Sequence, residues 1–305
     1  MASDRTIRIH APAKVNLVLR VLDRRPDGYH NLWSLMQTVD VTDTLDVRAM
    51  PGRPGIHLTC DDASLPTDRR NLIYRAAEAV LKRAGSAIGR DAGLAITIAK
   101  RIPVSAGLGG GSSNAAATIV ALNELLALRW SPTDMMKVGA PLGSDVPFFF
   151  CAPSAVVTGR GEAVEAVTLT GCRWIVLVNP GFPIETKWAY EQLSSRRASV
   201  APLADSLRRI VGGATASWDQ IVPLMENDFE AAVGPAHPEL AKVAQALREA
   251  GAEAAMLSGS GATVFGVFRD EAAALRAQRM LSGTQGWRVL AGAAGTGPLA
   301  CISKA

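Results

Sequence analysis

The chain has 305 residues, 48% of them hydrophobic and 20% charged, with a formal net charge of +4 at pH 7. This length and balance are typical of a globular protein with two domains, each burying its own core. No apolar run reaches the ~20 residues that span a membrane, no basic run is interleaved with aromatics, and Asp4 comes before any secretory core could form. We therefore expect a cytoplasmic protein that binds neither membrane nor nucleic acid.

The four cysteines, Cys60, Cys151, Cys172 and Cys301, are scattered along the chain and form no Cys-x-x-Cys pair. Reduced thiols are the simplest interpretation, and the spacing argues against a zinc site.

Residues 7–22 alternate between apolar and polar side chains, which predicts a strand or a pair of strands. Lys14 and Asn16 fall on the polar face and point the same way, about 7 Å apart along the strand. That face either carries chemistry or is the solvated side of an edge strand. The pattern alone leaves both interpretations open.

A turn signature follows at residues 27–32 and contains Gly28-Tyr29-His30. The Tyr-His pair is either a recognition element for a ring or phosphate, or a packed tyrosine beside a solvent-facing histidine. Beyond it, residues 45–48 and 56–59 are predicted to pair as strands around a turn at 51–55. A helix is predicted from residue 71 to a stop at Gly85.

The segment 103–117 is rich in glycine, follows a predicted strand at 94–98 and leads into a predicted helix at 113–128. Such a turn gathers backbone N–H groups and the positive end of a helix dipole, which favours a polyphosphate. The sequence matches neither a Walker A loop nor a dinucleotide fingerprint. Ser112, Ser113 and Asn114 are expected to cap the helix. The alternative is an ordinary flexible loop.

A second helix begins at residues 131–134, where a serine cap precedes a proline. It leads to Asp145, which lies between Gly143-Ser144 and an apolar run ending in Phe148-Phe149-Phe150. Asp145 either lies at the rim of an apolar wall or serves as a helix N-cap. Residues 154–162 are predicted to form a hairpin.

From about residue 170 the pattern restarts as a second unit. It predicts strands at 174–178, 254–257, 263–267 and 287–290 and helices at 186–193, 228–233, 239–250 and 271–281, with a loop-like segment at 194–216. A tight turn, Ser258-Gly259-Ser260-Gly261-Ala262, joins two of the strands. This order favours an antiparallel α+β sheet with helices on one side.

Three segments in this order, residues 11–17, 107–117 and 258–263, together resemble the signature motifs of the GHMP kinase superfamily. The resemblance implies a two-domain α+β fold. Residues 1–165 would form an N-terminal ATP-binding α/β domain, and residues 166–305 a C-terminal, ferredoxin-like antiparallel α+β domain. It also implies ATP and Mg²⁺ as cofactors.

Gly28-Tyr29-His30 and the segment 143–149 resemble one branch of that superfamily, which phosphorylates a cytidine-diphosphate-linked methylerythritol. That resemblance implies transfer of the γ-phosphoryl of ATP to the 2-hydroxyl of this small molecule, in the non-mevalonate route to isoprenoids. We expect the chain to act as a monomer or weak homodimer.

By the same resemblance, Lys14 and Asp145 are catalytic. The residues expected to bind the substrate are Asn16, Tyr29, His30, Thr186 and Tyr190. Those expected to bind ATP are Asn71, Leu72, Lys100, Pro103, Gly107, Leu108, Gly109, Gly110, Gly111, Ser112, Ser113 and Asn114. No second carboxylate lies beside the glycines for Mg²⁺, although Ser112 could reach it.

Two other functions fit parts of the pattern. Another member of the superfamily, such as homoserine or mevalonate kinase, would share the three motifs, but the Tyr29-His30 pair and residues 145–149 argue against it. A non-catalytic nucleotide-binding module would be expected to have lost Lys14 or Asp145, and this sequence keeps both.

Overall fold

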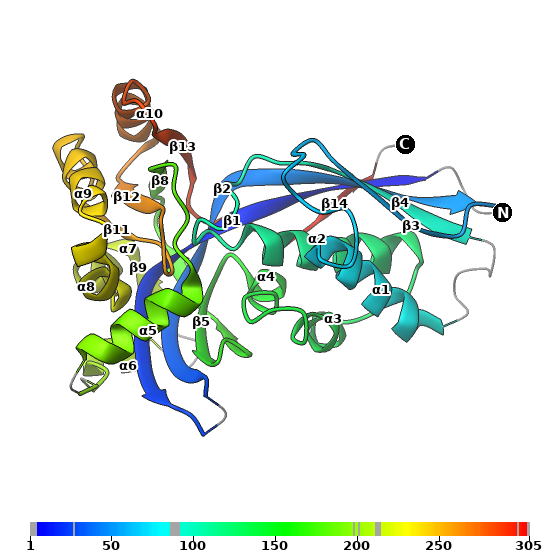
Figure 1. Cartoon of the computed structure of the whole chain (residues 1–305), viewed down its shortest axis with the longest axis horizontal. Coiled ribbons are helices and arrows are strands. Elements are labelled where there is room, and N and C mark those ends of the chain that lie inside the picture. Colours follow the sequence, from blue (N-terminus) through cyan, green and yellow to red (C-terminus); the bar gives the residue numbers. More distant parts are fainter. Residues whose placement is uncertain are drawn as a thin grey trace.

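Two long antiparallel strands, β1 (Thr6–Arg24) and β2 (His30–Pro51), run through both halves of the molecule. Figure 1 shows both strands running from the right of the view to its middle, bending downward there and ending in a projecting hairpin beside α5 (Thr186–Arg196). The computed structural model describes residues 5–26, 28–85, 92–197, 199–200, 202–210, 215–297 and 299–303. The predicted strand over residues 7–22 is confirmed, whereas the sequence patterns missed the strand over residues 30–44.

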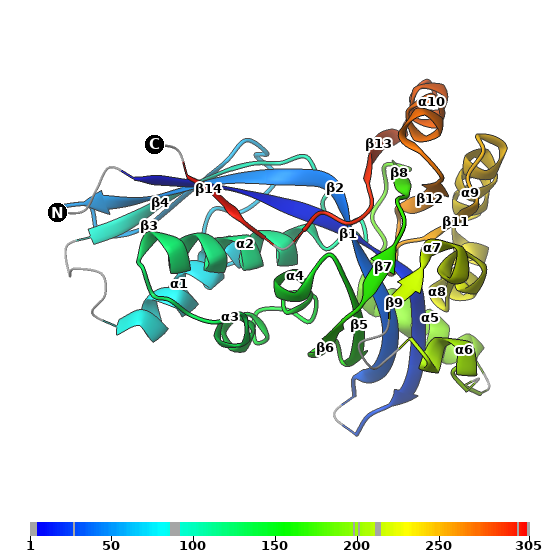
Figure 2. The ribbon, with the colours of Figure 1, turned by 180° about the vertical axis from the view of Figure 1, so that it is seen from behind.

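The larger sheet has eight strands in the order β10-β1-β2-β4-β3, with β14 added to β1, β5 to β2 and β6 to β5. Figure 2 shows β14, from the end of the chain, lying along β1. The remaining strands of this sheet are β3 (Gly55–Cys60), β4 (Ala92–Ala99), β5 (Ser154–Gly159), β6 (Ala163–Ala166), β10 (Glu226–Asn227) and β14 (Cys301–Ser303).

The predicted pairing around the turn at residues 51–55 is wrong. Strand β4 lies between the two segments, antiparallel to β2 and parallel to β3. A short turn favours direct pairing, but inserting the apolar β4 between β2 and the edge strand β3 buries Leu94, Ile96 and Ile98 in the core under this sheet. The helices that pack with this sheet are α1 (Leu72–Ala84), α2 (Gly110–Leu125), α3 (Pro132–Gly139) and α4 (Phe148–Cys151).

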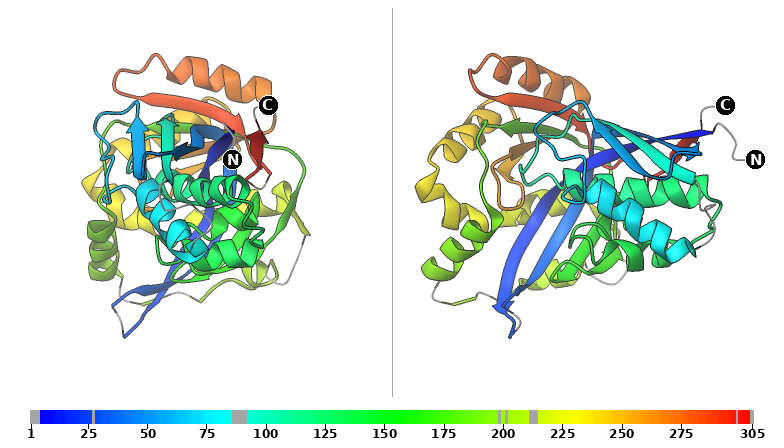
Figure 3. Two further views of the ribbon diagram at one scale, coloured as in Figure 1. Left: turned by 90° about the vertical axis from the view of Figure 1, so that its right-hand side faces the viewer. Right: turned by 45° about the vertical axis from the view of Figure 1, so that its right-hand side comes forward.

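The second sheet has four antiparallel strands in the order β11-β12-β8-β13, as the α+β interpretation of the second half expects. Its helices α8, α9 and α10 lie on the side away from the larger sheet (Figures 1 and 3). The strands are β8 (Trp174–Asn179), β11 (Ala254–Leu257), β12 (Val264–Phe268) and β13 (Arg288–Ala293); β7 (Thr168–Thr170) and β9 (Thr215–Ser217) form a separate parallel pair. The helices are α5 (Thr186–Arg196), α6 (Asp205–Arg208), α7 (Trp218–Ile221), α8 (Phe229–Val233), α9 (Glu239–Glu249) and α10 (Glu271–Leu281), with 3-10 turns at Val222–Leu224 and Gly234–Ala236.

The fully apolar run of β8 follows from its place between two cores. Ile175 and Leu177 pack toward the larger sheet, whereas Val176 and Val178 pack against the helices of the second unit. Because alternate side chains of a strand point to opposite faces, both faces must be apolar when both are covered.

The segment expected to be loop-like, 194–216, is more regular than predicted where the structure describes it. Helix α5 continues to Arg196, α6 occupies residues 205–208, and β9 begins at Thr215. Residues 198, 201 and 211–214, which include Gly212 and Gly213, lie outside the described residues. Across the described part of the chain, no helix is long and apolar enough to cross a bilayer.

Candidate active site

The glycine-rich segment connects β4 to α2. Gly107 and Gly109 have φ values of +78° and +67°, which glycine adopts without a Cβ penalty. Helix α2 begins at Gly110, with Gly109 as its N-cap and no side-chain cap. The expected capping by Ser112, Ser113 and Asn114 is therefore wrong, because the helix starts earlier and takes them into its first turns.

A cavity of about 590 Å³ lies over this segment, between it and the start of α1. We call it the glycine-loop cavity. Of the twelve residues expected to bind ATP, all but Ser113 line it; Ser113 is completely buried and its hydroxyl has no hydrogen-bond partner. Asn114 lines the cavity, and its side-chain oxygen is likewise buried without a partner. A helix N-terminus with free polar groups is suited to a phosphate chain.

Two side chains at the edge of this cavity are held by structural contacts. Asn71 caps α1 by accepting from the Ile73 N–H at 2.9 Å, and its amide donates to the Pro66 carbonyl at 2.8 Å. Lys100 pairs with Asp43, a carboxylate with no solvent exposure that also accepts from the N–H groups of residues 101 and 102. The sequence patterns did not single out Asp43, because an aspartate within a strand gives no local signal of its partners.

A small cavity of about 170 Å³, the junction cavity, contains the predicted catalytic pair. Lys14 is 3% exposed, and its Nζ lies 2.7 Å from Asn16 Oδ1 and 3.4 Å from Asp145 Oδ2. The expectation that residues 14 and 16 point the same way is confirmed. The alternative of a solvated edge face is wrong, because β2 pairs with β1 here and the side chains of Lys14 and Asn16 are buried.

Ser34 holds Asn16, and the backbone of Lys14 is joined to the glycine-rich segment. Asn16 donates to Ser34 Oγ at 2.8 Å, and Ser34 donates to the Val18 carbonyl at 2.7 Å. The N–H of Lys14 donates to the Leu108 carbonyl at 3.0 Å, which joins β1 directly to the glycine-rich segment. Asp145 does not cap a helix, since α4 begins at Phe148 with Pro147 as its N-cap.

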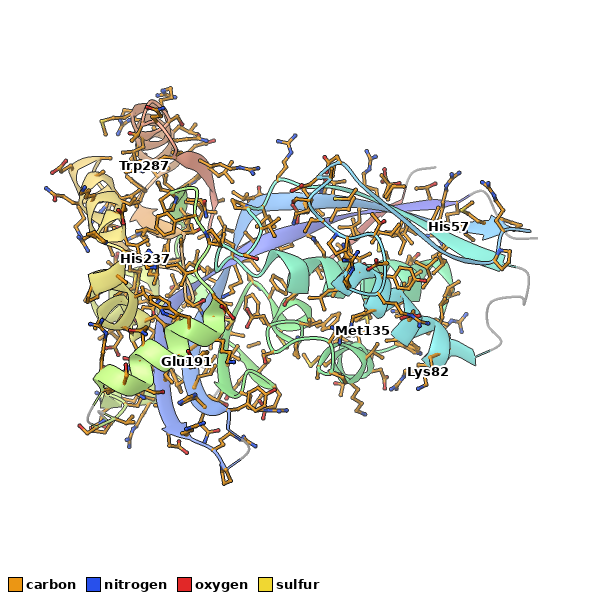
Figure 4. The ribbon with its side chains drawn as sticks, viewed as in Figure 1. His57, Lys82, Met135, Glu191, His237 and Trp287 are labelled. Atoms are coloured by element: carbon orange, nitrogen blue, oxygen red, sulfur yellow. The ribbon has the colours of Figure 1, made fainter. Side chains whose placement is uncertain are left out.

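A third cavity, of about 870 Å³, lies along α5, and we call it the α5 cavity. Four of the five expected substrate-binding residues, Tyr29, His30, Thr186 and Tyr190, line it together with Asp145; the fifth, Asn16, lines the junction cavity. Glu191 of α5, labelled in Figure 4, also lines it.

Aromatic rings build one wall of the α5 cavity. His30 stacks on Tyr190 with centroids 5.1 Å apart, and Tyr190 meets Phe229 edge-on at 4.9 Å. Burial raises the pKa of Tyr190 to about 12, and the negative charge of Asp145 contributes less to this rise. The Tyr190 hydroxyl therefore stays protonated near neutral pH. Tyr29 is 60% exposed, with the guanidinium of Arg160 5.2 Å above its ring. An exposed ring at a cavity mouth can stack on a flat ligand.

The three cavities are connected through shared lining residues. Gly107 and Gly109 line both the glycine-loop and junction cavities, Asp145 and Tyr190 line both the junction and α5 cavities, and Thr186 lines all three. One site therefore has a glycine-rich end, an aromatic end, and a lysine–carboxylate pair between them.

The turn at residues 258–262 supports this site from the second unit. Ser258 Oγ donates to the Gly107 carbonyl at 3.0 Å, and the hydroxyls of Ser260 and Thr186 lie 3.1 Å apart. A Cβ on Gly107 would come within 2.0 Å of the Ser258 carbonyl oxygen, so the two turns are in close backbone contact. The sequence patterns marked this turn as a motif but did not identify Ser258 or Ser260 as site residues.

Comparison with known proteins identifies the family. Residues 71–152 match the model of the GHMP kinases N terminal domain, and residues 204–285 match that of the GHMP kinases C terminal domain. The 4-diphosphocytidyl-2-C-methyl-D-erythritol kinase of Geobacter sp. (strain M21) is 41% identical over 281 residues, covering 92% of this chain and 96% of that protein. The protein of the same name from Syntrophus aciditrophicus (strain SB) is 40% identical, covering 93% and 97%.

Solved structures agree with this assignment. A crystal structure of 4-(cytidine 5'-diphospho)-2C-methyl-D-erythritol kinase has a TM-score of 0.77 and 32% identity, covering 95% of this chain and all of that one. Homoserine kinase from Cytophaga hutchinsonii shares the fold, with a TM-score of 0.74 over 99% of this chain and 98% of its own, but only 19% identity. Both halves match GHMP kinase models, and relatives and fold agree, so the chain belongs to the GHMP kinases, and within them to the 4-diphosphocytidyl-2-C-methyl-D-erythritol kinase family.

Proposed function

We propose that this protein transfers the γ-phosphoryl group of ATP to the 2-hydroxyl of 4-diphosphocytidyl-2-C-methyl-D-erythritol, a step of the non-mevalonate route to isoprenoid precursors. The single observation that carries the proposal is the position of the Lys14–Asp145 pair. Its 3.4 Å ion pair lies in the junction cavity, where a polyphosphate in the glycine-loop cavity and an alcohol in the α5 cavity would meet.

ATP would occupy the glycine-loop cavity with its phosphates over Gly107–Gly111. Cavities of roughly 300–1,000 Å³ are usual for small ligands, and this one measures about 590 Å³. Backbone N–H groups at the start of α2 would bind the phosphates, and Lys100 would add a positive charge near them. A Cβ on Gly110 would lie 3.5 Å from Lys100 Nζ, so this ammonium is close to the first turn of α2.

The cytidine ring would bind among Tyr29, His30 and Tyr190, which offer flat surfaces and polar edges. Neither homoserine nor mevalonate contains an aromatic ring, so an aromatic wall favours a nucleotide-linked alcohol over either of them. Thr186 and Asn16 would orient the alcohol end of the substrate toward Asp145.

In the reaction, the substrate hydroxyl oxygen forms a bond to the γ-phosphorus while the bond from that phosphorus to the β,γ-bridging oxygen breaks and ADP leaves. The hydroxyl proton passes to Asp145. Lys14 keeps Asp145 ionised and offsets negative charge on the transferred group. Because phosphoryl transfer has a loose transition state, alignment and charge neutralisation supply most of the catalysis.

The chain's residues fit a Mg²⁺ ion that arrives with ATP rather than one held in a protein cage. Within the described residues, no group of three or more His, Cys, Asp or Glu side chains could hold a metal. Mg²⁺ usually keeps several waters and binds substrate phosphates, and the hydroxyl of Ser112, which lines the glycine-loop cavity, would add one protein ligand here. When bound, the ion would neutralise charge on the β- and γ-phosphates.

The test is turnover by the purified protein with MgATP and one of three alcohols: 4-diphosphocytidyl-2-C-methyl-D-erythritol, homoserine or mevalonate. We expect ADP release with the first alcohol only, together with a new phosphomonoester signal in ³¹P NMR. Selective turnover of homoserine or mevalonate would contradict the proposal.

Two further features remain predictions: a domain boundary between residues 165 and 166, and action as a monomer or weak homodimer. The single chain supplies Lys14, Asp145 and the walls of all three cavities, so the proposed reaction requires no second copy.

A further inference from the structure

Asn227 and Asp228 are adjacent residues that line none of the three cavities, yet they bond to structures on both sides of the site. They lie where β10 ends and α8 begins, and Asn227 pairs with Leu19 of β1. The second unit thus meets the long hairpin at this point.

Asn227 faces the glycine-rich side. Its side chain is buried, and its amide donates to the carbonyls of Leu257 and Gly259 at 2.8 and 2.9 Å. Its oxygen accepts from the Phe229 N–H at 2.9 Å. Gly259 lies in the turn that supports the glycine-rich segment, since a Cβ there would lie 3.2 Å from the Gly107 carbonyl oxygen. Asn227 therefore fixes the turn behind the proposed phosphate site.

Asp228 faces the opposite side, toward α5. Its carboxylate lies between two guanidinium groups, with Arg20 Nε at 3.1 Å and Arg197 Nη1 at 3.0 Å, and it accepts from the Val21 N–H at 2.8 Å. Arg197 is the C-cap of α5 and also donates to the carbonyls of Val21 and Leu22. We call Arg20, Arg197 and Asp228 the Asp228 cluster; it fastens the end of α5 to β1.

Helix α5 carries much of the α5 cavity wall. Thr186, Lys187, Tyr190, Glu191 and Ser194 all line that cavity. If the end of the helix were released, these side chains would shift together, whereas the glycine-rich segment is attached elsewhere, through Lys14 and Ser258.

We propose that Asn227 and Asp228 are positioning residues that set the two ends of the site separately: Asn227 the glycine-rich end, and Asp228 the end formed by α5. This inference rests on the proposed function for its substrates. Neither residue contacts the reacting atoms, so each acts through the element to which it bonds.

The test separates the Michaelis constants of the two substrates. Asp228→Asn keeps the size of the side chain but removes the charge between two guanidiniums. Because the charge-assisted hydrogen bonds that hold the end of α5 are weakened, we expect the KM for the cytidylated alcohol to rise on the order of tenfold, with the KM for ATP nearly unchanged. Asn227→Asp replaces two donated hydrogen bonds by an oxygen facing two carbonyls, and it should raise KM for ATP instead.

A double-mutant cycle tests the route through α5. Arg197→Gln alone should raise KM for the alcohol, and the double variant should raise it by less than the product of the two single effects, because both changes remove the Arg197–Asp228 contact. Asn227→Ser is the milder second variant should Asn227→Asp not fold.

Glu253→Gln is the matched control. Glu253 also bridges two guanidiniums, Arg173 at 2.7 Å and Arg269 at 2.5 Å, and its side chain is 18% exposed, the same as that of Asp228. It lines none of the three cavities, so both KM values should match those of the wild type. The inference would be overturned if Asp228→Asn and Asn227→Asp each changed the KM for ATP and the KM for the alcohol equally, or changed neither.

Wild-type protein that binds ADP and CDP but does not phosphorylate the alcohol would contradict the proposed function instead.

Discussion

Lys14 shows how a single side chain depends on its surroundings at this site. Burying an unpaired ammonium is costly, and Lys14 is balanced by Asp145 on one side and by the amide oxygen of Asn16 on the other. Asn16 is in turn held by Ser34. The ammonium is thus held in one place before any ligand arrives, which is the arrangement that electrostatic catalysis requires.

The first prediction concerns Asp145→Asn. We expect turnover to fall by about 10²-fold or more, the range for loss of a general base, because an amide cannot accept the hydroxyl proton. ATP binding should be largely kept, since the glycine-loop cavity does not include this side chain. Steady-state kinetics and calorimetry with a non-hydrolysable ATP analogue measure the two effects. A near-normal rate in this variant would remove Asp145 from the role of base.

The second prediction concerns His30. Its pKa lies below the usual 6.5 because of burial and the positive charges of Arg24 and Arg197, partly opposed by Asp23. Between the folded-state pKa and 6.5 the unfolded chain binds more protons, so the free energy of unfolding decreases as the pH falls through this window. Proton NMR titration should place the His30 pKa below 6.5, and Arg24→Gln should move it upward. A wild-type pKa at or above 6.5 would contradict this account.

Apart from the roles that the family resemblance implied, the position of a side chain was predictable only where a local pattern carried it. The period of the first strand placed residues 14 and 16 on one face, because strand alternation is a local property. Asp43 and Asn227 have partners 57 to 59 and 30 to 32 residues away, respectively, so no local spacing could reveal them. Phe229 meets Tyr190 only because α8 packs beside α5 in the folded protein.

At the scale of elements, the start of α2 is set by glycine geometry rather than by side-chain caps. Gly109 adopts a left-handed conformation, and Lys14 lies directly across it. The preference of serine and asparagine for caps was the misleading signal in the sequence, because glycine can also begin a helix and leaves room for a ligand.

The third prediction follows from this contact. In Gly109→Ala, the new Cβ would lie 2.8 Å from Cγ and 3.1 Å from Cε of Lys14, in a conformation that disfavours alanine. Displacing the ammonium by about 1 Å is expected to lower kcat on the order of 100-fold. Gly251→Ala is the control. Gly251 has a φ of +97°, and a Cβ there would have no neighbour within 4 Å, so the alanine introduces backbone strain without displacing a side chain. A similar loss of kcat in both variants would contradict the role given to the Lys14 contact.

Strand order was the least predictable property of the elements. Local patterns identified most strands and helices of the second unit, because its hydrophobic periods are clear. They could not show that β4 would separate β2 from β3, since that choice depends on which apolar strand is covered on both edges by its neighbours in the folded sheet. The strand over residues 30–44 was missed because most of its side chains are buried, on both faces, which removes the alternation.

At the scale of the whole molecule, the long hairpin joins what the sequence suggested were two separate units. Strand β1 contributes Ile7 and Ile9 to the first core, Val15 and Leu17 to the second, and Val21 to the third. The end of the chain returns as β14 to pair with β1. A unit boundary can be suggested by a restarting pattern, but such a returning strand is visible only in three dimensions.

The fourth prediction is that the molecule unfolds in one transition. Unfolding of either half would strip apolar partners from β1, which contributes side chains to all three cores, so neither half can keep its core while the other is open. Scanning calorimetry should give a single peak whose calorimetric and van't Hoff enthalpies agree. ATP at about 100 times its Kd adds about 2.7 kcal/mol and should raise the Tm of the whole peak by about 4 °C. Two peaks, with only one moved by ATP, would mean that the hairpin does not couple the halves.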